Sequence, residues 1–182
     1  VCLAGERVTG VETDAGPIPA DGVVNAAGAW AAQIGKLAGV DLPITPARRQ
    51  LAVVAPETPF PTDAPLVTDL DAGVYFRPET AETAYVGGHF SDTHSGGAGP
   101  ADPDGYRREY DQDWAERALA EASEVTTNLG PGSRIEDGWA GLYAMTTDHH
   151  PIIAEVVPGF VVAAGFSGHG FMQAPATGQV VA

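Results

Sequence analysis

The sequence predicts a mixed α+β and α/β protein in which short strands outnumber helices. Runs of β-branched residues recur along the chain, and glycine, proline or aspartate interrupts them. Two of these runs pass through small residues directly into helical periodicity, which is the pattern of a strand followed by a helix. With 182 residues, of which 44% are hydrophobic, the chain is long enough to bury one core or two.

The first of these junctions follows a predicted meander of strands near the N-terminus. Residues 8–11 and 23–24 are rich in valine, and the second run ends in the small-residue stretch "NAAG". From residue 29 to residue 38, apolar side chains return at helical spacing. They are Trp30, Ile34, Leu37 and Ala38. We therefore expect a strand that meets a helix through a turn of small residues.

The middle of the chain predicts a β-rich region with one longer helix. Strands are expected around residues 51–54, 74–76 and 84–86. Residues 91–105 show no periodicity and predict a surface loop. A helix is expected from residue 106 to about residue 126, because apolar side chains form one stripe there. The stripe, which we expect to face the core, consists of Tyr110, Trp114, Ala118 and Ala122.

The C-terminal third predicts a hairpin and a second strand-to-helix junction. Extended segments are expected at residues 135–143 and 151–157, and Pro158-Gly159 predicts a turn into a strand at residues 160–164. A glycine-rich bend and a helical stretch follow. Because Pro175 interrupts that stretch, we expect the regular helix to begin near this proline.

The bend "GFSGHG" at residues 165–170 has two interpretations. A strand, a glycine-rich bend and a helix N-terminus together present main-chain N–H groups and a partial positive charge to electron-rich ligand atoms. Glycines also allow a flat ligand to approach the main chain closely. The alternative is a tight turn that binds no ligand.

Hydrolysis is a competing hypothesis for this bend. Ser167, His169 and Asp148 supply the residue types of a hydrolytic triad. A nucleophile elbow has the pattern G-x-S-x-G, however, and His169 stands where its second glycine belongs. The sequence therefore does not favour a hydrolase.

The histidines do not predict a metal site. His149 and His150 are expected on a strand, where neighbouring side chains point to opposite faces and cannot bind one ion together. His89 and His94 flank a loop at a spacing that suits no helical ligand pair.

Composition excludes several classes of partner. Acidic residues outnumber basic ones by 24 to 9, which gives a net charge of −15 and no basic surface for nucleic acid or anionic lipid. Such a balance fits a halophilic protein or an ordinary acidic one. Cys2 is the single cysteine, so no intrachain disulfide forms and a reducing, cytoplasmic location is expected. The apolar stretches are too short to span a membrane.

The blocks "DGVVNAAGAWAAQIGKLAGVDLPITPARRQ", "VYFRPE" and "WAGLYAMTTDHHPIIAEVVPGFVVAAGFSGHGFMQAPATGQVVA" follow one another along the chain. Together they resemble the D-amino-acid-oxidase-like (DAO) superfamily of FAD-dependent oxidoreductases. The nearest likeness is to the branch with glycine oxidase, the β subunit of sarcosine oxidase and dye-linked L-proline dehydrogenase. The most specific piece is "GFSGHGF…APATG".

The resemblance implies part of a Rossmann-like FAD-binding domain plus a substrate domain built on an antiparallel sheet. It assigns residues 1–46 and 148–182 to the FAD-binding domain and residues 47–147 to the substrate-binding domain. The G-x-G-x-x-G turn that would hold the FAD pyrophosphate does not occur in the sequence. We therefore expect this chain to be a C-terminal fragment of a longer flavoenzyme.

The resemblance also implies where FAD is bound. Two segments correspond to parts of the family that approach the cofactor, the second lying along the isoalloxazine ring. N–H groups there would stabilise the negative charge of the reduced flavin. The implied cofactor-binding residues are Ala27, Gly28, Ala29, Trp30, Gly165, Phe166, Ser167, Gly168, His169, Gly170, Phe171 and Met172.

Four further residues are candidates for binding substrate. Tyr75 and Arg77 alternate on one predicted strand and share a face, so Arg77 could hold a carboxylate while Tyr75 donates a hydrogen bond. An ion pair of Arg77 with a nearby acid is the alternative. Tyr143 falls where relatives often bring a residue to the substrate. His150 could tune the substrate amine or the flavin by changing protonation.

The implied activity is oxidation of the C–N bond of an amino acid or secondary amine, with hydride passing to flavin N5. The electron acceptor would be oxygen, a quinone or a partner subunit, and oligomerisation stays open. The specific amine and the choice between oxidase and dehydrogenase stay open as well. A non-catalytic subunit with the same fold is the main alternative.

Overall fold

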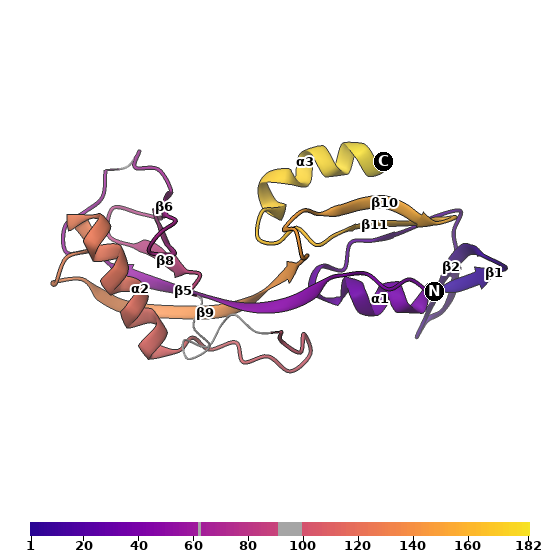
Figure 1. Ribbon diagram of the computed structural model, residues 1–182, viewed down its shortest axis with the longest axis horizontal. Coiled ribbons are helices and arrows are strands. Elements are labelled where there is room, and N and C mark those ends of the chain that lie inside the picture. The colour runs from indigo at the N-terminus through magenta and orange to yellow at the C-terminus, as the bar shows by residue number, and fades with distance from the viewer. Residues whose placement is uncertain (62, 91–99) are drawn as a thin grey trace. The chain divides into compact units, whose positions relative to one another are not determined.

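The computed structural model of the chain describes residues 1–61, 63–90 and 100–182 and divides into two compact units (Figure 1). Unit 1 comprises Val1–Ala47, Ala101–Pro103 and Leu142–Ala182, and unit 2 comprises Arg48–Pro100 and Asp104–Gly141. Helices combine with largely antiparallel sheets, which confirms the predicted mixed fold class. His94 and most of the predicted loop at residues 91–105 lie outside the described residues.

Unit 1 contains two three-stranded sheets. The first is the predicted N-terminal meander, with the order β1 (Cys2–Ala4), β2 (Arg7–Thr13) and β3 (Gly16–Pro19). The second has the order β10 (Ile152–Val157), β11 (Phe160–Ala164) and β4 (Val23–Asn25). β10 and β11 form the predicted hairpin, whereas β11 and β4 run parallel.

Short helices follow the two parallel strands of unit 1. β4 leads into the 3₁₀ turn η1 (Gly28–Trp30) and helix α1 (Ala31–Leu37), and β11 leads through the glycine-rich bend into α3 (Gly170–Val181). A buried apolar cluster lies between the sheet and α1. It includes Val8, Ala31, Ala38, Leu42, Ile44, Phe160, Val162 and Ala164.

The expectation that Pro175 delays the last helix is wrong, because α3 begins at Gly170 and continues through the proline. Pro175 lies in the second turn of the helix. Its missing N–H therefore removes one hydrogen bond, to the carbonyl group of Phe171. Phe171 itself is almost fully exposed, so water can satisfy that carbonyl group.

Unit 2 is built on a five-stranded antiparallel sheet with the order β6-β7-β8-β5-β9. Its strands are β5 (Thr45–Ala55), β6 (Val67–Asp69), β7 (Val74–Pro78), β8 (Ala84–Gly88) and β9 (Arg134–Met145). The first residues of β5, 45–47, and the last residues of β9, 142–145, belong to unit 1. The register places Tyr75 opposite Gly87 and Arg77 opposite Tyr85.

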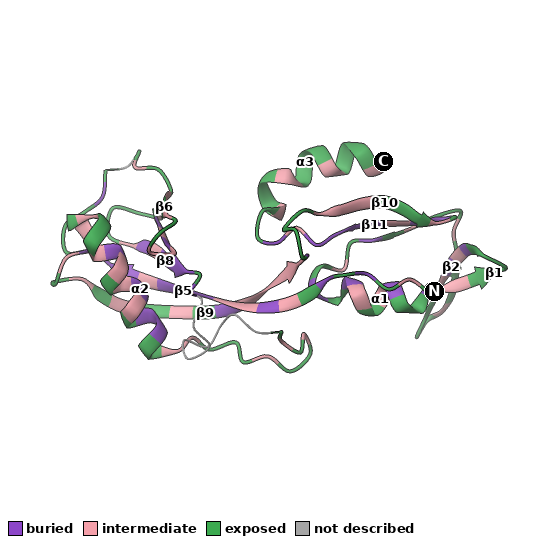
Figure 2. Ribbon diagram, in the orientation of Figure 1, coloured by how far each residue is buried: buried purple, intermediate pink, exposed green. Residues whose placement is uncertain are grey.

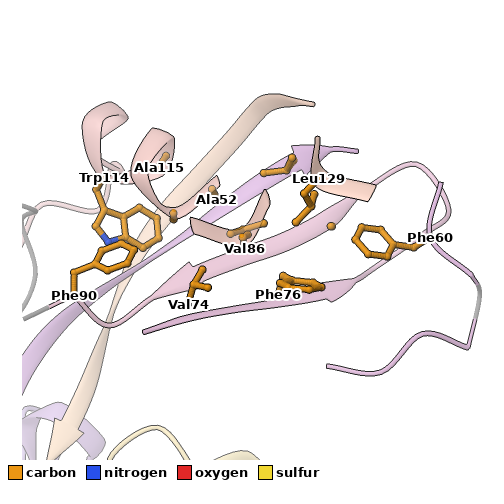
Figure 3. Close-up of a cluster of buried hydrophobic side chains, with 13 residues drawn as sticks. Ala52, Phe60, Val74, Phe76, Val86, Phe90, Trp114, Ala115 and Leu129 are labelled. Carbon is orange, nitrogen blue, oxygen red and sulfur yellow. The ribbon is translucent and has the colours of Figure 1, made fainter. Parts of the chain in front are cut away.

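One face of this sheet is covered by α2 (Gln112–Val125) and the following 3₁₀ turn η3 (Thr127–Leu129). Figure 3 shows Trp114 against Phe90, with Val74, Phe76, Val86 and Leu129 in the same apolar core. Trp114, Ala118 and Ala122 are all buried, which confirms that these three residues of the predicted stripe face the core, whereas Tyr110 lies before the helix and is partly buried against the same core. Tyr75 and Arg77 alternate with the core residues and so belong to the opposite face of the sheet.

Arg48 explains why α2 begins at Gln112 rather than at residue 106. Its guanidinium group donates hydrogen bonds to the carbonyl oxygen atoms of Arg107 (2.8 Å) and Glu109 (2.5 Å) and pairs with the Asp111 carboxylate (2.8 Å). Burial lowers the pKa of this guanidinium group, although the Glu109 carboxylate acts in the opposite direction. These tertiary bonds hold residues 107–111 outside the helix.

Candidate functional site

Two turns of unit 1 meet at one edge of a sheet. β4 and β11 are neighbouring parallel strands, with Val162 paired to Asn25, the last residue of β4. The chain leaves the carboxyl ends of both strands through turns at residues 26–30 and 165–169 (Figure 1). Carboxyl ends of parallel strands are where open α/β sheets bind ligands. The structure thus brings the two predicted cofactor-binding segments to the same sheet edge.

Asn25 organises the first turn. Its side chain is 2% exposed, and its amide nitrogen donates to the carbonyl oxygen of Ala31 (2.9 Å) while its side-chain oxygen accepts from the N–H of Ala27 (3.3 Å). The N–H of Trp30 donates to the carbonyl oxygen of Ala27 (2.9 Å). One buried amide side chain therefore ties the strand end to the start of α1.

Gly28 occupies the exposed tip of this turn. Its φ of +54° lies in the left-handed region, and a Cβ added there would meet nothing within 4 Å. Ala29 is buried, whereas the Trp30 side chain is partly exposed at 38%. The backbone conformation requires the glycine, and the space beside it is open.

The second turn has an unusual backbone. Gly165 (φ +80°), Ser167 (φ +52°) and Gly168 (φ +95°) all lie in the left-handed region. Such a conformation costs a serine about 1–3 kcal/mol and persists only where surrounding contacts impose it. Ser167 is 6% exposed, so these contacts are found in the protein interior.

The Ser167 hydroxyl group is used internally and is not presented to solvent. It accepts a hydrogen bond from the N–H of Thr146 (3.1 Å), lies 3.2 Å from the Thr146 hydroxyl group and donates to the carbonyl oxygen of Gly165 (3.2 Å). Within the part of the chain that the structure describes, no histidine is among its hydrogen-bond partners. The contacts of Ser167 are those of a structural hydroxyl group and do not support a nucleophile.

Two main-chain N–H groups of the second turn are also engaged internally. The N–H of Ser167 donates to the carbonyl oxygen of Ala144 (3.0 Å), and the N–H of His169 donates to the carbonyl oxygen of Phe166 (2.9 Å). No side chain caps the N-terminus of α3. The N–H groups at the start of a helix have no acceptor within the helix, so those of Gly170, Phe171 and Met172 are the ones offered to a ligand.

The start of α3 is apolar and exposed. Phe171 is 99% exposed and Met172 is 73% exposed, and Figure 2 shows α3 without a buried residue along its length. The side-chain oxygen of Gln173 is buried, with no hydrogen-bond partner among the described residues. The start of α3 therefore offers apolar surface to whatever covers it, whereas the unpaired Gln173 oxygen atom lies out of reach of solvent.

Charge is excluded from both turns. No Asp, Glu, Lys or Arg occurs from Gly22 to Gly35 or from Val156 to Ala182, although the chain carries a net charge of −15. The sheet edge therefore lacks carboxylates of its own segments that would repel an electron-rich ligand. Uncapped N–H groups in an uncharged surrounding favour an anion or a ring that takes up negative charge.

His149 and His150 lie in a turn, so the prediction that they occupy a strand is wrong. His149 has a φ of +63°, and His150 is exposed beside Asp148. The N–H of His150 donates to the Asp148 carboxylate (3.0 Å), and this bond chiefly lowers the pKa of Asp148. The hydroxyl group of Thr146 donates to the carbonyl oxygen of His150 (2.9 Å). Thr146 thus contacts both this turn and the glycine-rich bend.

The predicted substrate-binding residues fall in both units. Tyr143 lies on β9 within unit 1, and its ring is packed so closely on Gly168 that an added Cβ would lie 2.4 Å from Cε2. His150 also lies in unit 1. Tyr75 and Arg77 lie on β7 in unit 2.

The open face of the unit 2 sheet carries an aromatic and cationic cluster. The Tyr75 ring packs on Gly87, where an added Cβ would lie 2.1 Å from Cζ. The Arg77 guanidinium group pairs with Glu79 (2.5 Å) and lies 5.7 Å from the centre of the Tyr85 ring. This ion pair is the alternative that the sequence left open for Arg77.

Sequence reasoning missed four residues near these sites: Asn25, Tyr85, Trp139 and Thr146. Tyr85 joins the cluster because the register of the sheet places it opposite Arg77 on the neighbouring strand β8. Its ring contacts the Trp139 ring edge to face, with the ring centres 5.6 Å apart. The register itself had no signal in the sequence. Asn25 had one, because a polar residue closes a valine-rich strand just before a turn.

The described ranges hold neither a cluster of metal ligands nor a membrane-spanning helix. Residues 1–61, 63–90 and 100–182 contain no group of three or more His, Cys, Asp or Glu side chains placed to hold a metal ion. None of the helices in these ranges is long and apolar enough to cross a membrane.

Comparison with known proteins gives a consistent result. A model of the family "FAD dependent oxidoreductase" (DAO) matches residues 2–182. FAD-dependent oxidoreductase domain-containing protein 1 of Bos taurus is 34% identical over 181 residues, which cover 91% of this chain and 36% of the relative. Mitochondrial sarcosine dehydrogenase of Homo sapiens is 31% identical over 190 residues, which cover 97% of this chain and 19% of the relative.

A solved structure agrees with the sequence comparisons. L-proline dehydrogenase from P. horikoshii matches with a TM-score of 0.82 at 29% identity, over 97% of this chain and 46% of that protein. The chain therefore spans less than half the length of each of these three relatives.

Proposed function

The chain belongs to the FAD dependent oxidoreductase (DAO) family, and on this premise we propose that it is part of an enzyme that oxidises the C–N bond of an amino acid or secondary amine. The observation that carries the proposal is the pair of uncharged turns at the carboxyl ends of β4 and β11. Two relatives, sarcosine dehydrogenase and L-proline dehydrogenase, suggest the substrate class.

The residues present fit the ring end of FAD. Gly28 leaves open space at a turn tip, and the start of α3 offers uncapped N–H groups beside exposed apolar side chains. FAD, when bound, supplies the hydride acceptor. In this proposal, residues 27–30 and 165–172 hold the cofactor, and the N–H groups of Gly170, Phe171 and Met172 stabilise the negative charge that it gains.

The protein's own residues would bind and orient the substrate. Of the candidates, Tyr75 offers a hydroxyl group on the open face of the unit 2 sheet. Arg77 would have to exchange its Glu79 partner for the substrate carboxylate, at the cost of an exposed ion pair. Tyr143 and His150 are the candidates in unit 1. Unit 1 corresponds in this proposal to the FAD-binding domain and unit 2 to the substrate-binding domain.

A non-catalytic subunit with the same fold is the second candidate. A flavin bound by the product of the complete reading frame would argue against it.

The test is to purify the product of the complete reading frame and record its visible spectrum. We expect a flavin spectrum that bleaches anaerobically on addition of the correct amino acid or N-methyl amine. Recovery of the colour in air would identify an oxidase, whereas no recovery would indicate a quinone, a dye-like acceptor or a partner subunit. A colourless protein that FAD cannot reconstitute would contradict the proposal. The cytoplasmic location and the halophilic character stay predictions.

A further inference from the structure

We propose that Thr146 is a positioning residue that holds the glycine-rich bend in the backbone conformation needed at the start of α3. The inference rests on the proposed function where it concerns the flavin, but its geometric part concerns unit 1 alone. Three residues of the bend have left-handed backbones, and one of them is the serine Ser167. Some interaction must impose that conformation, because a serine does not adopt it readily.

The hydrogen bonds around Ser167 supply that interaction. Thr146 binds the Ser167 hydroxyl group twice, through its own N–H (3.1 Å) and through its hydroxyl group (3.2 Å). The N–H of Ser167 is bound in turn by the carbonyl oxygen of Ala144 (3.0 Å). Thr146 and Ser167 are each 6% exposed, so water does not compete for these bonds.

The hydroxyl protons available fix the direction of the hydrogen bond between Thr146 and Ser167. Each hydroxyl group has one proton, and that of Thr146 is donated to the carbonyl oxygen of His150 (2.9 Å). The Thr146 hydroxyl oxygen is therefore the acceptor toward Ser167. The Ser167 proton is shared between this oxygen and the carbonyl oxygen of Gly165 (3.2 Å). Removing the Thr146 hydroxyl group would break its bonds to both turns at once.

Packing completes the support for the bend. The Thr146 methyl carbon lies where a side chain on Gly165 would be, 2.6 Å from an added Cβ. The Tyr143 ring fills the same position beside Gly168, at 2.4 Å. Tyr143 near the end of β9 and Thr146, the residue after the strand, thus contact two of the three glycines of the bend, Gly168 and Gly165. Because the hydroxyl group of Thr146 also binds His150, one side chain fixes a predicted cofactor segment and a predicted substrate residue.

The first measurement needs no flavin. In the product of the complete reading frame, Thr146→Val should raise the amide hydrogen-exchange rates of Ser167 and His169, whose N–H groups are hydrogen-bonded inside the protein, by about tenfold, while peptides from unit 2 exchange as before. Thr146→Ser keeps the hydroxyl group but loses the methyl group that packs on Gly165, so it should restore most of the slow exchange. Equal exchange in the valine and serine variants, or a rise spread evenly over the whole protein, would overturn the proposal. Ser167→Ala removes the other hydroxyl group and serves as the second variant if Thr146→Val does not fold.

The second measurement uses the flavin. If the bend positions the N–H groups of α3, the midpoint potential of bound FAD should become more negative in Thr146→Val and return toward the parent value in Thr146→Ser. An unchanged potential in both variants would overturn the flavin part of the inference. A parent protein that binds no flavin would overturn the proposed function instead, and the exchange measurement would still decide the role of Thr146 in the bend.

Discussion

At the scale of single residues, two buried polar side chains fix the backbone of the turns at residues 26–30 and 165–169. Asn25 and Thr146 each bond to groups on both sides of a turn, and neither faces solvent. A buried polar group is tolerated only when its hydrogen bonds are made, so such residues specify one backbone conformation among many. The partners of Asn25 are local in sequence, whereas Thr146 binds both the nearby His150 and the remote Ser167.

Asn25→Ala should lower the free energy of unfolding by about 1–3 kcal/mol, because the carbonyl group of Ala31 and the N–H of Ala27 lose a buried partner. Urea unfolding measures the change. Gln33→Ala, on the exposed side of α1, is the matched control and should change it by about 0.5 kcal/mol or less. Equal effects of the two substitutions would show that Asn25 does not organise the turn.

At the scale of single elements, β7 and β8 present a face that depends on close packing of a ring on a glycine. Gly87→Ala should push the Tyr75 ring away and lower the free energy of unfolding by about 1–3 kcal/mol. If Tyr75 binds substrate, KM should rise as well. Gly141→Ala on β9, where an added Cβ meets nothing within 4 Å, is the control and should cost nothing measurable by urea unfolding. A harmless Gly87→Ala would contradict this packing.

The sequence predicted some secondary-structure elements correctly and misplaced or missed others. The β10 and β11 hairpin and the core stripe of α2 followed from local signals, namely a Pro-Gly turn and helical periodicity. The start of α2 was placed too early, because Arg48 binds carbonyl groups that would otherwise enter the helix. The parallel pairing of β4 with β11 joins the two ends of the chain, and no local pattern encodes it. Only the family resemblance brought these segments together.

At the scale of the whole molecule, the charged side chains lie outside the two turn segments that we propose to bind FAD. The chain is strongly acidic, yet the segments around both turns of unit 1 contain no Asp, Glu, Lys or Arg. An electron-rich cofactor can approach such segments without repulsion. The apolar side chains of Phe171, Met172 and Val180 on α3 are exposed.

The most direct test of the account compares the FAD dissociation constants of Gly28→Ala and Gly39→Ala in the product of the complete reading frame. Both glycines have left-handed backbones in unit 1, and an added Cβ meets nothing within 4 Å at either. Both substitutions should therefore cost about 1–2 kcal/mol of stability. We predict that Gly28→Ala raises the dissociation constant about tenfold or more, because its methyl group enters the space meant for FAD, while Gly39→Ala changes it less than about twofold. Equal affinities in the parent and both variants, or no FAD binding by the parent, would contradict the account.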